Sequence, residues 1–275
     1  MLRDVHGHRR IIVPFILACF LLFTSVPVAL AASRVPSPSL IGPKEHYLAL
    51  GDSLAFGFQP NGDFTHGYVN DFFKEDLQKD GVQNVVNLGC PGETSSTFIN
   101  GGCPAAPGNP PQLVTALAYL QANAGQVSPV TLDIGANDVL GDVDPSTCTV
   151  NSTKFSTDLA TLDANLTGII LPQLHAALVV NSQVTGDLVM MNYYDPLQNI
   201  CPNTVPFTEM LNQHLASDVS PFGIIVDVFG AFGGARVPNP HICKYTWMCN
   251  SPPNIHATDK GYEVIADTFD KDTGD

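Results

Sequence analysis

Four short polar segments of the sequence carry residue types that acyl transfer requires. Ser53 stands in Gly-Asp-Ser-Leu, Gly92 in Pro-Gly-Glu-Thr, Asn137 in Gly-Ala-Asn-Asp, and His256 lies near the C-terminal end. A serine hydroxyl is a weak nucleophile until a neighbouring base takes its proton. Histidine, with an ordinary pKa of about 6.5, can accept that proton and return it. The residue types therefore predict Ser53 as nucleophile and His256 as general base.

Acyl transfer also builds negative charge on the carbonyl oxygen, and donors fixed around that oxygen stabilise it. Gly92 lacks a Cβ, so a substrate can approach its backbone N–H closely. The side-chain amide of Asn137 and the N–H of Ser53 are two further donors. We expect these three residues to form an oxyanion hole.

The elements that must position these residues alternate between strand and helix. Short apolar runs predict buried strands, and amphipathic stretches predict helices. We expect strands at 47–50, 82–88, 130–134, 187–194 and 223–229, helices at 67–80, 110–122, 156–180 (kinked at Pro172), 207–219 and 258–269, and loops at 96–109, 140–153 and 233–255. This alternation predicts a five-stranded parallel sheet covered on both faces, with ligands beyond the carboxyl ends of the strands.

The first 45 residues have the pattern of an export signal and a linker. Arg3, Arg9 and Arg10 precede an almost continuously apolar run at 11–30, and a small-x-small site ends at Ala31. This pattern predicts a secretory signal peptide at 1–31, cleaved near Ala31. An uncleaved membrane anchor is the alternative. A proline-rich linker at 32–45 and a single domain at 46–275 follow, and we expect secretion.

The charge of the chain excludes some classes of partner. The net charge is −14, with 12 basic and 26 acidic residues. Such a chain repels phosphate backbones and anionic lipid headgroups. We expect no nucleic acid partner and no stable membrane association of the mature form. A monomer that acts on a small-molecule or lipid substrate is the expected state.

Six cysteines follow the predicted signal peptide. An even number in an exported chain indicates disulfides. Many pairings are possible, and pairing of nearest neighbours gives Cys90–Cys103, Cys148–Cys201 and Cys243–Cys249. A metal site is the alternative, but the irregular spacing lacks the tight ligand pairs of such sites.

The four segments together resemble the SGNH subgroup of the GDSL esterases and lipases. The resemblance extends from about His46 to Phe269 and includes Gly261-Tyr262 after the histidine. It implies a flavodoxin-like, three-layer α/β/α sandwich and hydrolysis of esters or thioesters. It also implies that Ser53 is the nucleophile and that Ser53, Gly92 and Asn137 form the oxyanion hole. We expect the reaction to need no cofactor and no metal.

The sequence departs from the family pattern before the histidine. The family usually has an acidic residue two or three positions earlier, where this chain has Asn254 and Pro253. An amide cannot supply the negative charge that stabilises an imidazolium. We therefore expect a Ser–His dyad whose histidine is oriented by a backbone carbonyl or by Asn254 Oδ1.

The predicted function is that of a secreted serine carboxylic ester hydrolase, an esterase or lipase that forms an acyl-enzyme on Ser53. Two alternatives remain open. One is an esterase or acyltransferase that acts on the O-acyl groups of polysaccharides. The other is a non-catalytic binding domain on a hydrolase scaffold, which would explain the missing acid.

Overall fold

The computed structural model describes Met1 and residues 40–274, and residues 40–274 belong to one compact unit. The predicted signal peptide at 1–31 and the first part of the predicted linker lie outside the described residues. Residues 40–45 contain neither helix nor strand. Among the described residues, no helix combines the length and the apolar character that a membrane crossing requires.

A five-stranded parallel sheet forms the centre of the fold, as the sequence predicts. Its strands stand in the order β2-β1-β3-β8-β9, and they are β1 (His46–Gly51), β2 (Asn84–Asn87), β3 (Val127–Asp133), β8 (Leu188–Met191) and β9 (Ile224–Val226). Two small antiparallel pairs lie outside this sheet: β4 (Val143–Asp144) with β5 (Thr149–Val150), and β6 (Val179–Val180) with β7 (Gln183–Val184).

Burial distinguishes the inner strands from the edge strands. Every residue of β3 and β8 is buried, and in β1 only His46 is partly exposed. Such continuous burial is expected of parallel strands covered by helices on both faces. The edge strands β2 and β9 are only half-buried. The apolar runs of the sequence therefore identify the strands that lie inside the sheet.

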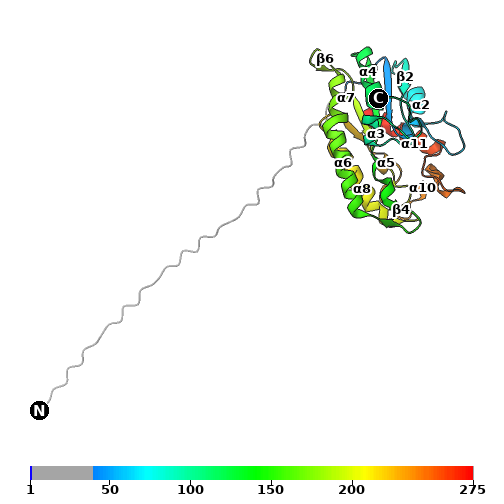
Figure 1. The fold of residues 1–275 in the computed structure, drawn as a ribbon, viewed down its shortest axis with the longest axis vertical. Helices are drawn as coiled ribbons and strands as arrows, with labels where there is room; N and C mark the ends of the chain where they lie inside the picture. The colour runs from blue at the N-terminus through cyan, green and yellow to red at the C-terminus, as the bar shows by residue number, and fades with distance from the viewer. Residues whose placement is uncertain (2–39, 275) are drawn as a thin grey trace. The chain divides into compact units, whose positions relative to one another are not determined.

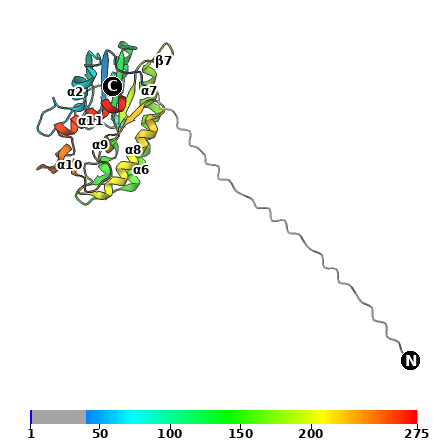
Figure 2. The ribbon, with the colours of Figure 1, turned by 180° about the vertical axis from the view of Figure 1, so that it is seen from behind.

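Helices cover both faces of the sheet and complete the three-layer α/β/α sandwich (Figure 1). One layer contains α2 (Tyr68–Phe72) packed against α11 (Asp259–Thr273), with α9 (Val228–Ala231) and α10 (Pro240–Tyr245) beside α11 (Figure 2). The other layer contains α3 (Ser95–Asn100), α4 (Gln112–Ala122), α6 (Ser152–Asn165), α7 (Leu171–Ala177) and α8 (Val205–Val219). The short helices α1 (Ser53–Phe56) and α5 (Ala136–Val139) follow β1 and β3 directly.

The helix expected at 156–180 is divided into three parts. Between α6 and α7 lies a π-helical turn, Leu166–Ile170, and Pro172 is in the first turn of α7. Proline lacks the N–H that an α-helix needs at this point, and a wider turn just before it accommodates the mismatch. The predicted irregularity is present, but it lies before the proline and extends over one turn.

All three predicted loops contain regular structure. Residues 140–153 include a 3-10 turn at Leu140–Asp142, the strands β4 and β5, and the first two residues of α6. The prediction of an unstructured 96–109 is wrong at its start, because α3 covers Ser95–Asn100. Thr94 and Thr97 form a reciprocal capping box that begins this helix. Within 233–255, α10 is helical and Asn239 caps it.

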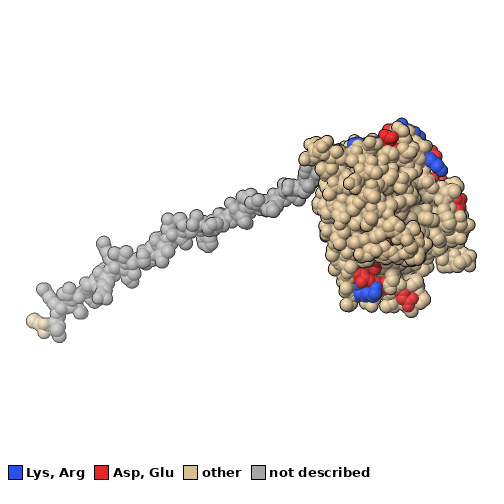
Figure 3. Space-filling view, turned by 45° about the horizontal axis from the view of Figure 1, so that its top comes forward, with Lys and Arg blue, Asp and Glu red and all other residues tan. Residues whose placement is uncertain are grey.

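Few charged side chains interrupt the face shown in Figure 3, and those present lie toward its margins. Only 14% of the residues are charged, and most of these are acidic. This part of the surface is therefore largely uncharged.

Candidate active site

Ser53 and His256 are hydrogen-bonded at the carboxyl edge of the sheet. Ser53 follows β1 as the first residue of α1, and the Asp52 side chain caps this short helix by accepting from Leu54 N at 2.8 Å. His256 lies just before α11, whose N-cap is Thr258. Ser53 Oγ and His256 Nε2 are 2.9 Å apart. The two residues are thus in the geometry that proton transfer between them requires.

The side chain of Asn254 contacts the other ring nitrogen of His256. Asn254 Oδ1 lies 2.6 Å from His256 Nδ1 and accepts a second hydrogen bond from His256 N at 3.0 Å. An amide oxygen is an acceptor, so Nδ1 carries the proton. Nε2 is then left with a lone pair that faces the Ser53 hydroxyl.

Burial keeps the imidazole of His256 neutral. Desolvation lowers the pKa of His256 from 6.5 to about 4. No carboxylate counteracts this effect at Nδ1, since the partner there is an amide. At neutral pH the ring is therefore an unprotonated base.

The three expected oxyanion donors come from the segments that follow β1, β2 and β3. Gly92 follows β2 and has φ = +85°, a conformation that favours glycine. The N–H groups of Ser53 and Gly92 have no hydrogen-bond partner in the described part of the chain, so they are available to a ligand. Asn137 Nδ2 donates to Glu93 O at 3.0 Å, which ties this amide to the loop of Gly92.

Two buried carboxyl groups lie beneath the nucleophile. Asp52 accepts from Tyr193 Oη at 3.0 Å, and Asp133 accepts from Tyr68 Oη at 2.8 Å and from Ala55 N at 3.1 Å. Burial raises the pKa of both carboxyls, and the charge of Asp52 raises the pKa of Asp133 further. The pKa of Asp133 is raised well above its ordinary value, so Asp133 is the carboxyl of this pair that holds a proton.

Gln112 joins the nucleophile loop to the oxyanion loop. Its Oε1 accepts from Gly51 N at 2.6 Å, and its Nε2 donates to Gly51 O and to Glu93 Oε2, each at 3.0 Å. Gly51 has φ = +140°, and a Cβ there would collide with Asp133. The chain can therefore pass between these buried groups only with glycine at this position.

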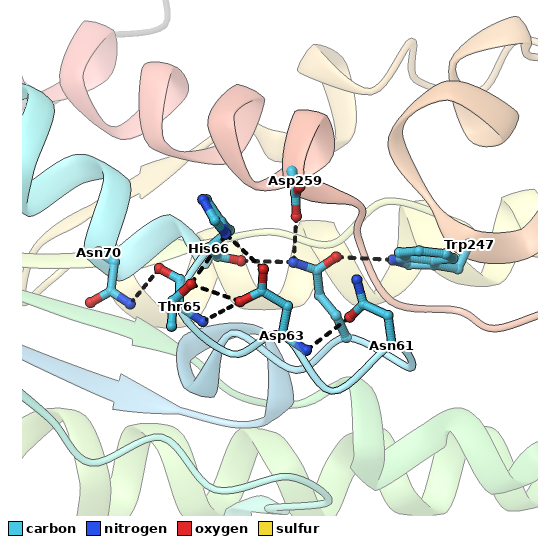
Figure 4. Close-up of polar contacts among 8 residues, drawn as sticks. Asn61, Asp63, Thr65, His66, Asn70, Trp247 and Asp259 are labelled. Atoms are coloured by element: carbon cyan, nitrogen blue, oxygen red, sulfur yellow. Dashed lines mark hydrogen bonds and ion pairs between the residues drawn. The ribbon is translucent and has the colours of Figure 1, made fainter.

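Trp247 connects the histidine loop to the loop that follows the nucleophile. Its backbone N donates to His256 O at 3.0 Å and its carbonyl accepts from Asn254 N at 3.1 Å. The indole Nε1 donates to Gln59 Oε1 at 3.2 Å, and Gln59 Nε2 donates to Asp259 at 2.6 Å. Figure 4 shows Trp247 and Asp259 pointing toward this loop. Through its backbone and its indole, Trp247 thus joins the segments on both sides of the dyad.

An apolar cavity of about 110 Å³ opens beside Ser53. Its walls come from the loops after β1, β3 and β8 and from α6 and α8. The apolar side chains that line it include Leu54, Val139, Leu140, Val143, Phe155, Leu197, Phe207 and Leu211. Asn137 and His256 also line it. A group bound to Ser53 can therefore extend into a space with few polar partners.

The three disulfides pair nearest neighbours, as expected: Cys90–Cys103, Cys148–Cys201 and Cys243–Cys249. The first closes the loop that carries Gly92, and the third closes the segment that contains Trp247. The second joins two loops that contribute to the cavity wall. All three therefore crosslink segments around the site.

Side chains that can ligate a metal come together where the loop after Phe58 meets the start of α11. Asp63, His66 and Asp259 place one ligand atom each within 4.8 Å of the others. Asp63 and His66 are already paired with each other at 2.9 Å. None of these three groups hydrogen-bonds to Ser53 Oγ, whose partners among the described residues are His256 and Asp52.

Sequence reasoning did not find the residues that hold the site together. Asp133 could have been found from the sequence, because a carboxylate at the end of a buried apolar strand indicates a functional or supporting role. No local pattern identifies the supporting roles of Gln59, Gln112 and Trp247, since their hydrogen bonds join segments that are far apart in the chain.

The family is shown by comparison with known proteins. Residues 49–264 match the model of the GDSL-like Lipase/Acylhydrolase family. A lipase from a goat rumen metagenome has a similar structure (TM-score 0.57, 16% identity, covering 83% of this chain and 97% of the other). An acetylxylan esterase from Geobacillus stearothermophilus also has a similar structure (TM-score 0.54, 18% identity, covering 86% of this chain and 96% of the other). Among curated protein sequences, none matches. The chain belongs to the GDSL-like lipase/acylhydrolase family, a family of ester hydrolases.

Proposed function

We propose that this protein is a secreted serine carboxylic ester hydrolase that acts through an acyl-enzyme on Ser53. The observation that supports this most strongly is the hydrogen-bonded series from Ser53 through His256 to Asn254. It supplies a nucleophile, a neutral base and an acceptor that orients the base.

The reaction has two half-reactions. Ser53 Oγ attacks the ester carbonyl carbon while its proton passes to His256 Nε2. Ser53 N–H, Gly92 N–H and the Asn137 amide stabilise the negative oxygen. The bond to the alcohol then breaks, and His256 gives its proton to the leaving oxygen. A water molecule attacks the acyl-serine, its proton passes to His256, and the acid leaves as Ser53 regains its proton.

The cavity supports an apolar acyl group as substrate. Its walls are mainly aliphatic and aromatic, so a longer acyl chain would gain about 0.8 kcal/mol per buried methylene. An acetyl group alone would leave most of this space empty. This favours an esterase or lipase over an esterase that removes acetyl groups from polysaccharides.

Turnover of p-nitrophenyl esters by the purified protein tests the proposal. We expect hydrolysis that Ser53→Ala abolishes, that increases from acetate to hexanoate, and that EDTA leaves unchanged. Turnover no higher than that of Ser53→Ala would refute it. Covalent labelling of Ser53 by a fluorophosphonate separates an enzyme from a non-catalytic binding domain, since only an activated serine reacts.

Export is supported by the signal-peptide pattern at 1–31 and by the three disulfides. Mass spectrometry of protein recovered from the medium of an expressing culture tests it. We expect a mature N-terminus near residue 32, and a retained residue 1 would contradict the proposed cleavage.

A further inference from the structure

Three phenylalanine rings form a row beside the dyad, with Phe64 packed against both Phe56 and Phe58. The centroids of Phe56 and Phe64 are 5.3 Å apart, and those of Phe58 and Phe64 are 5.7 Å apart. The Phe58 ring lies 4.5 Å from the His256 imidazole. We call Phe56, Phe58 and Phe64 the phenylalanine shelf. It begins at His256 and extends from it toward solvent.

The shelf is exposed at its outer end. Phe56 is 36% and Phe64 is 42% exposed, whereas Phe58 is half-buried against His256. Single exposed apolar side chains are common, but rings in contact make a continuous patch, which favours a binding role. None of the three lines the apolar cavity beside Ser53. The site therefore has two separate apolar surfaces.

The shelf is held in place by polar contacts beneath it. Tyr262 Oη donates to Phe58 O at 2.8 Å. Gln59 Nε2 donates to His66 O at 3.0 Å and to Asp259 at 2.6 Å, which closes the loop that carries Phe64. Figure 4 shows the contacts that the polar residues of this loop make with one another. A surface fixed in advance loses little entropy when a ligand binds.

The chemistry assigns different parts of an ester to the two surfaces. His256 Nε2 must reach the leaving oxygen in order to protonate it, so the alcohol part lies on the side of His256. The acyl part remains on Ser53 and has the cavity available to it. Resting on the proposed function, we propose that the phenylalanine shelf binds the alcohol part, and that the enzyme prefers esters of apolar and aromatic alcohols.

Two variants and one matched control test this proposal. Phe64→Ser and Phe56→Ser each remove an exposed ring. Val114→Ser removes a side chain of α4 that is 55% exposed and lies outside both surfaces. The substrates are dissolved methyl, butyl, benzyl and 2-phenylethyl butyrate. Each variant is compared with the unaltered protein on each ester, so that intrinsic reactivity cancels.

We expect Phe64→Ser to lower kcat/KM for the benzyl and phenylethyl esters by about tenfold and to leave the methyl ester nearly unchanged. Phe56→Ser should show the same pattern, and Val114→Ser should show none. An unaltered melting temperature will confirm that the variants are folded. Equal loss on all four esters, or no loss on any, would overturn the proposal.

Three further results would also overturn it. A changed preference between methyl butyrate and methyl octanoate would place the acyl chain on the shelf. If kcat/KM for acetylated xylose fell as much as kcat/KM for the benzyl ester, the shelf would bind sugar rings and aromatic rings alike. A loss confined to esters above their solubility limit would assign it to a lipid surface. Failure of the proposed function differs from all of these, because no ester would then be hydrolysed faster than by Ser53→Ala.

Discussion

Asn254 Oδ1 accepts a hydrogen bond from His256 Nδ1 at 2.6 Å, at the position where a carboxylate would complete a triad. The amide fixes the orientation and tautomer of the ring as a carboxylate would. It adds no negative charge, so it does not counteract the effect of burial on the imidazolium. The site therefore has a well-oriented base that is weak by the standard of histidine.

Asn254→Ala tests how much catalysis depends on the orientation of the His256 ring, since Asn254 contributes no charge. Removing the acceptor leaves the ring free to rotate and to change tautomer. We expect kcat to fall by roughly 10- to 100-fold with little change in KM. Steady-state kinetics and the rate of fluorophosphonate labelling will measure this. Near-complete activity would show that a backbone carbonyl can take over, as a simple dyad requires.

Asn254→Asp restores a carboxylate behind the histidine. An opposite charge at hydrogen-bond distance favours the imidazolium and so raises the pKa of His256 from about 4. The base must be neutral to act, so in the unaltered protein activity should fall only as the pH approaches 4. In the variant this acid limb should move to higher pH. An unchanged profile of kcat/KM against pH would contradict the assignment of His256 as base.

The hydrogen bond between Trp247 and Gln59 should affect catalysis although neither residue contacts the substrate. Trp247→Phe removes the indole donor and keeps the backbone bonds to Asn254 and His256. Gln59→Leu removes the acceptor. We expect each to lower kcat about threefold to tenfold with KM unchanged.

The double variant provides the control for this pair. If the shared bond acts through His256, the double variant should be no slower than Gln59→Leu alone, since one interaction cannot be lost twice. Multiplicative effects, or a lower melting temperature with unchanged kcat, would assign these residues a structural role only.

Asp133→Asn tests the proton that Asp133 holds beneath the nucleophile. The folded-state pKa of Asp133 is raised by burial and by Asp52, so the folded protein binds a proton that the unfolded chain releases. The stability that Asp133 contributes should therefore fall as the pH rises above about 4, the ordinary pKa of aspartate. The amide cannot titrate, so the variant should lose less stability between pH 5 and pH 8 in urea unfolding. Identical slopes would show that Asp133 is ionised.

Phe207→Ala enlarges the acyl cavity. Phe207 lines the cavity and packs edge-to-face on Phe155, with centroids 5.1 Å apart. We expect its removal to shift the preferred p-nitrophenyl ester to an acyl chain that is longer by about two to four methylene groups. Phe222→Ala is the matched control, because Phe222 packs on His175 and lies outside the cavity. A shift in both variants would mean that general loosening is the cause.

The sequence predicted the sheet and its edge better than the connections. Runs such as 130–134 identify buried strands because burial on both faces leaves little choice of residue type. The residues expected at the carboxyl edge, Ser53 and His256, are hydrogen-bonded there. The start of α3 was missed because its signal, a capping box of two threonines, lacks the usual Glu or Gln.

The supporting contacts could not be read from the chain. Gln112 and Trp247 act through partners that are 61 and 188 residues away in sequence. A polar residue in a helix or loop has the same local pattern whether it faces water or a buried backbone group. Only the packing of the elements decides between these, and for this reason the residues that position the site emerged from the structure alone.

The hairpin of β6 and β7 is a suitable position for attaching this protein to a solid support. It precedes β8, so it lies at the amino edge of the sheet, opposite Ser53. Asn181 and Ser182 form its tip with φ of 51° and 62°, and Val179 and Val184 beside them are exposed. A cysteine introduced by Ser182→Cys would attach the protein to a solid support with the catalytic face turned toward the medium, because the geometry of the fold itself sets the orientation of the immobilised layer.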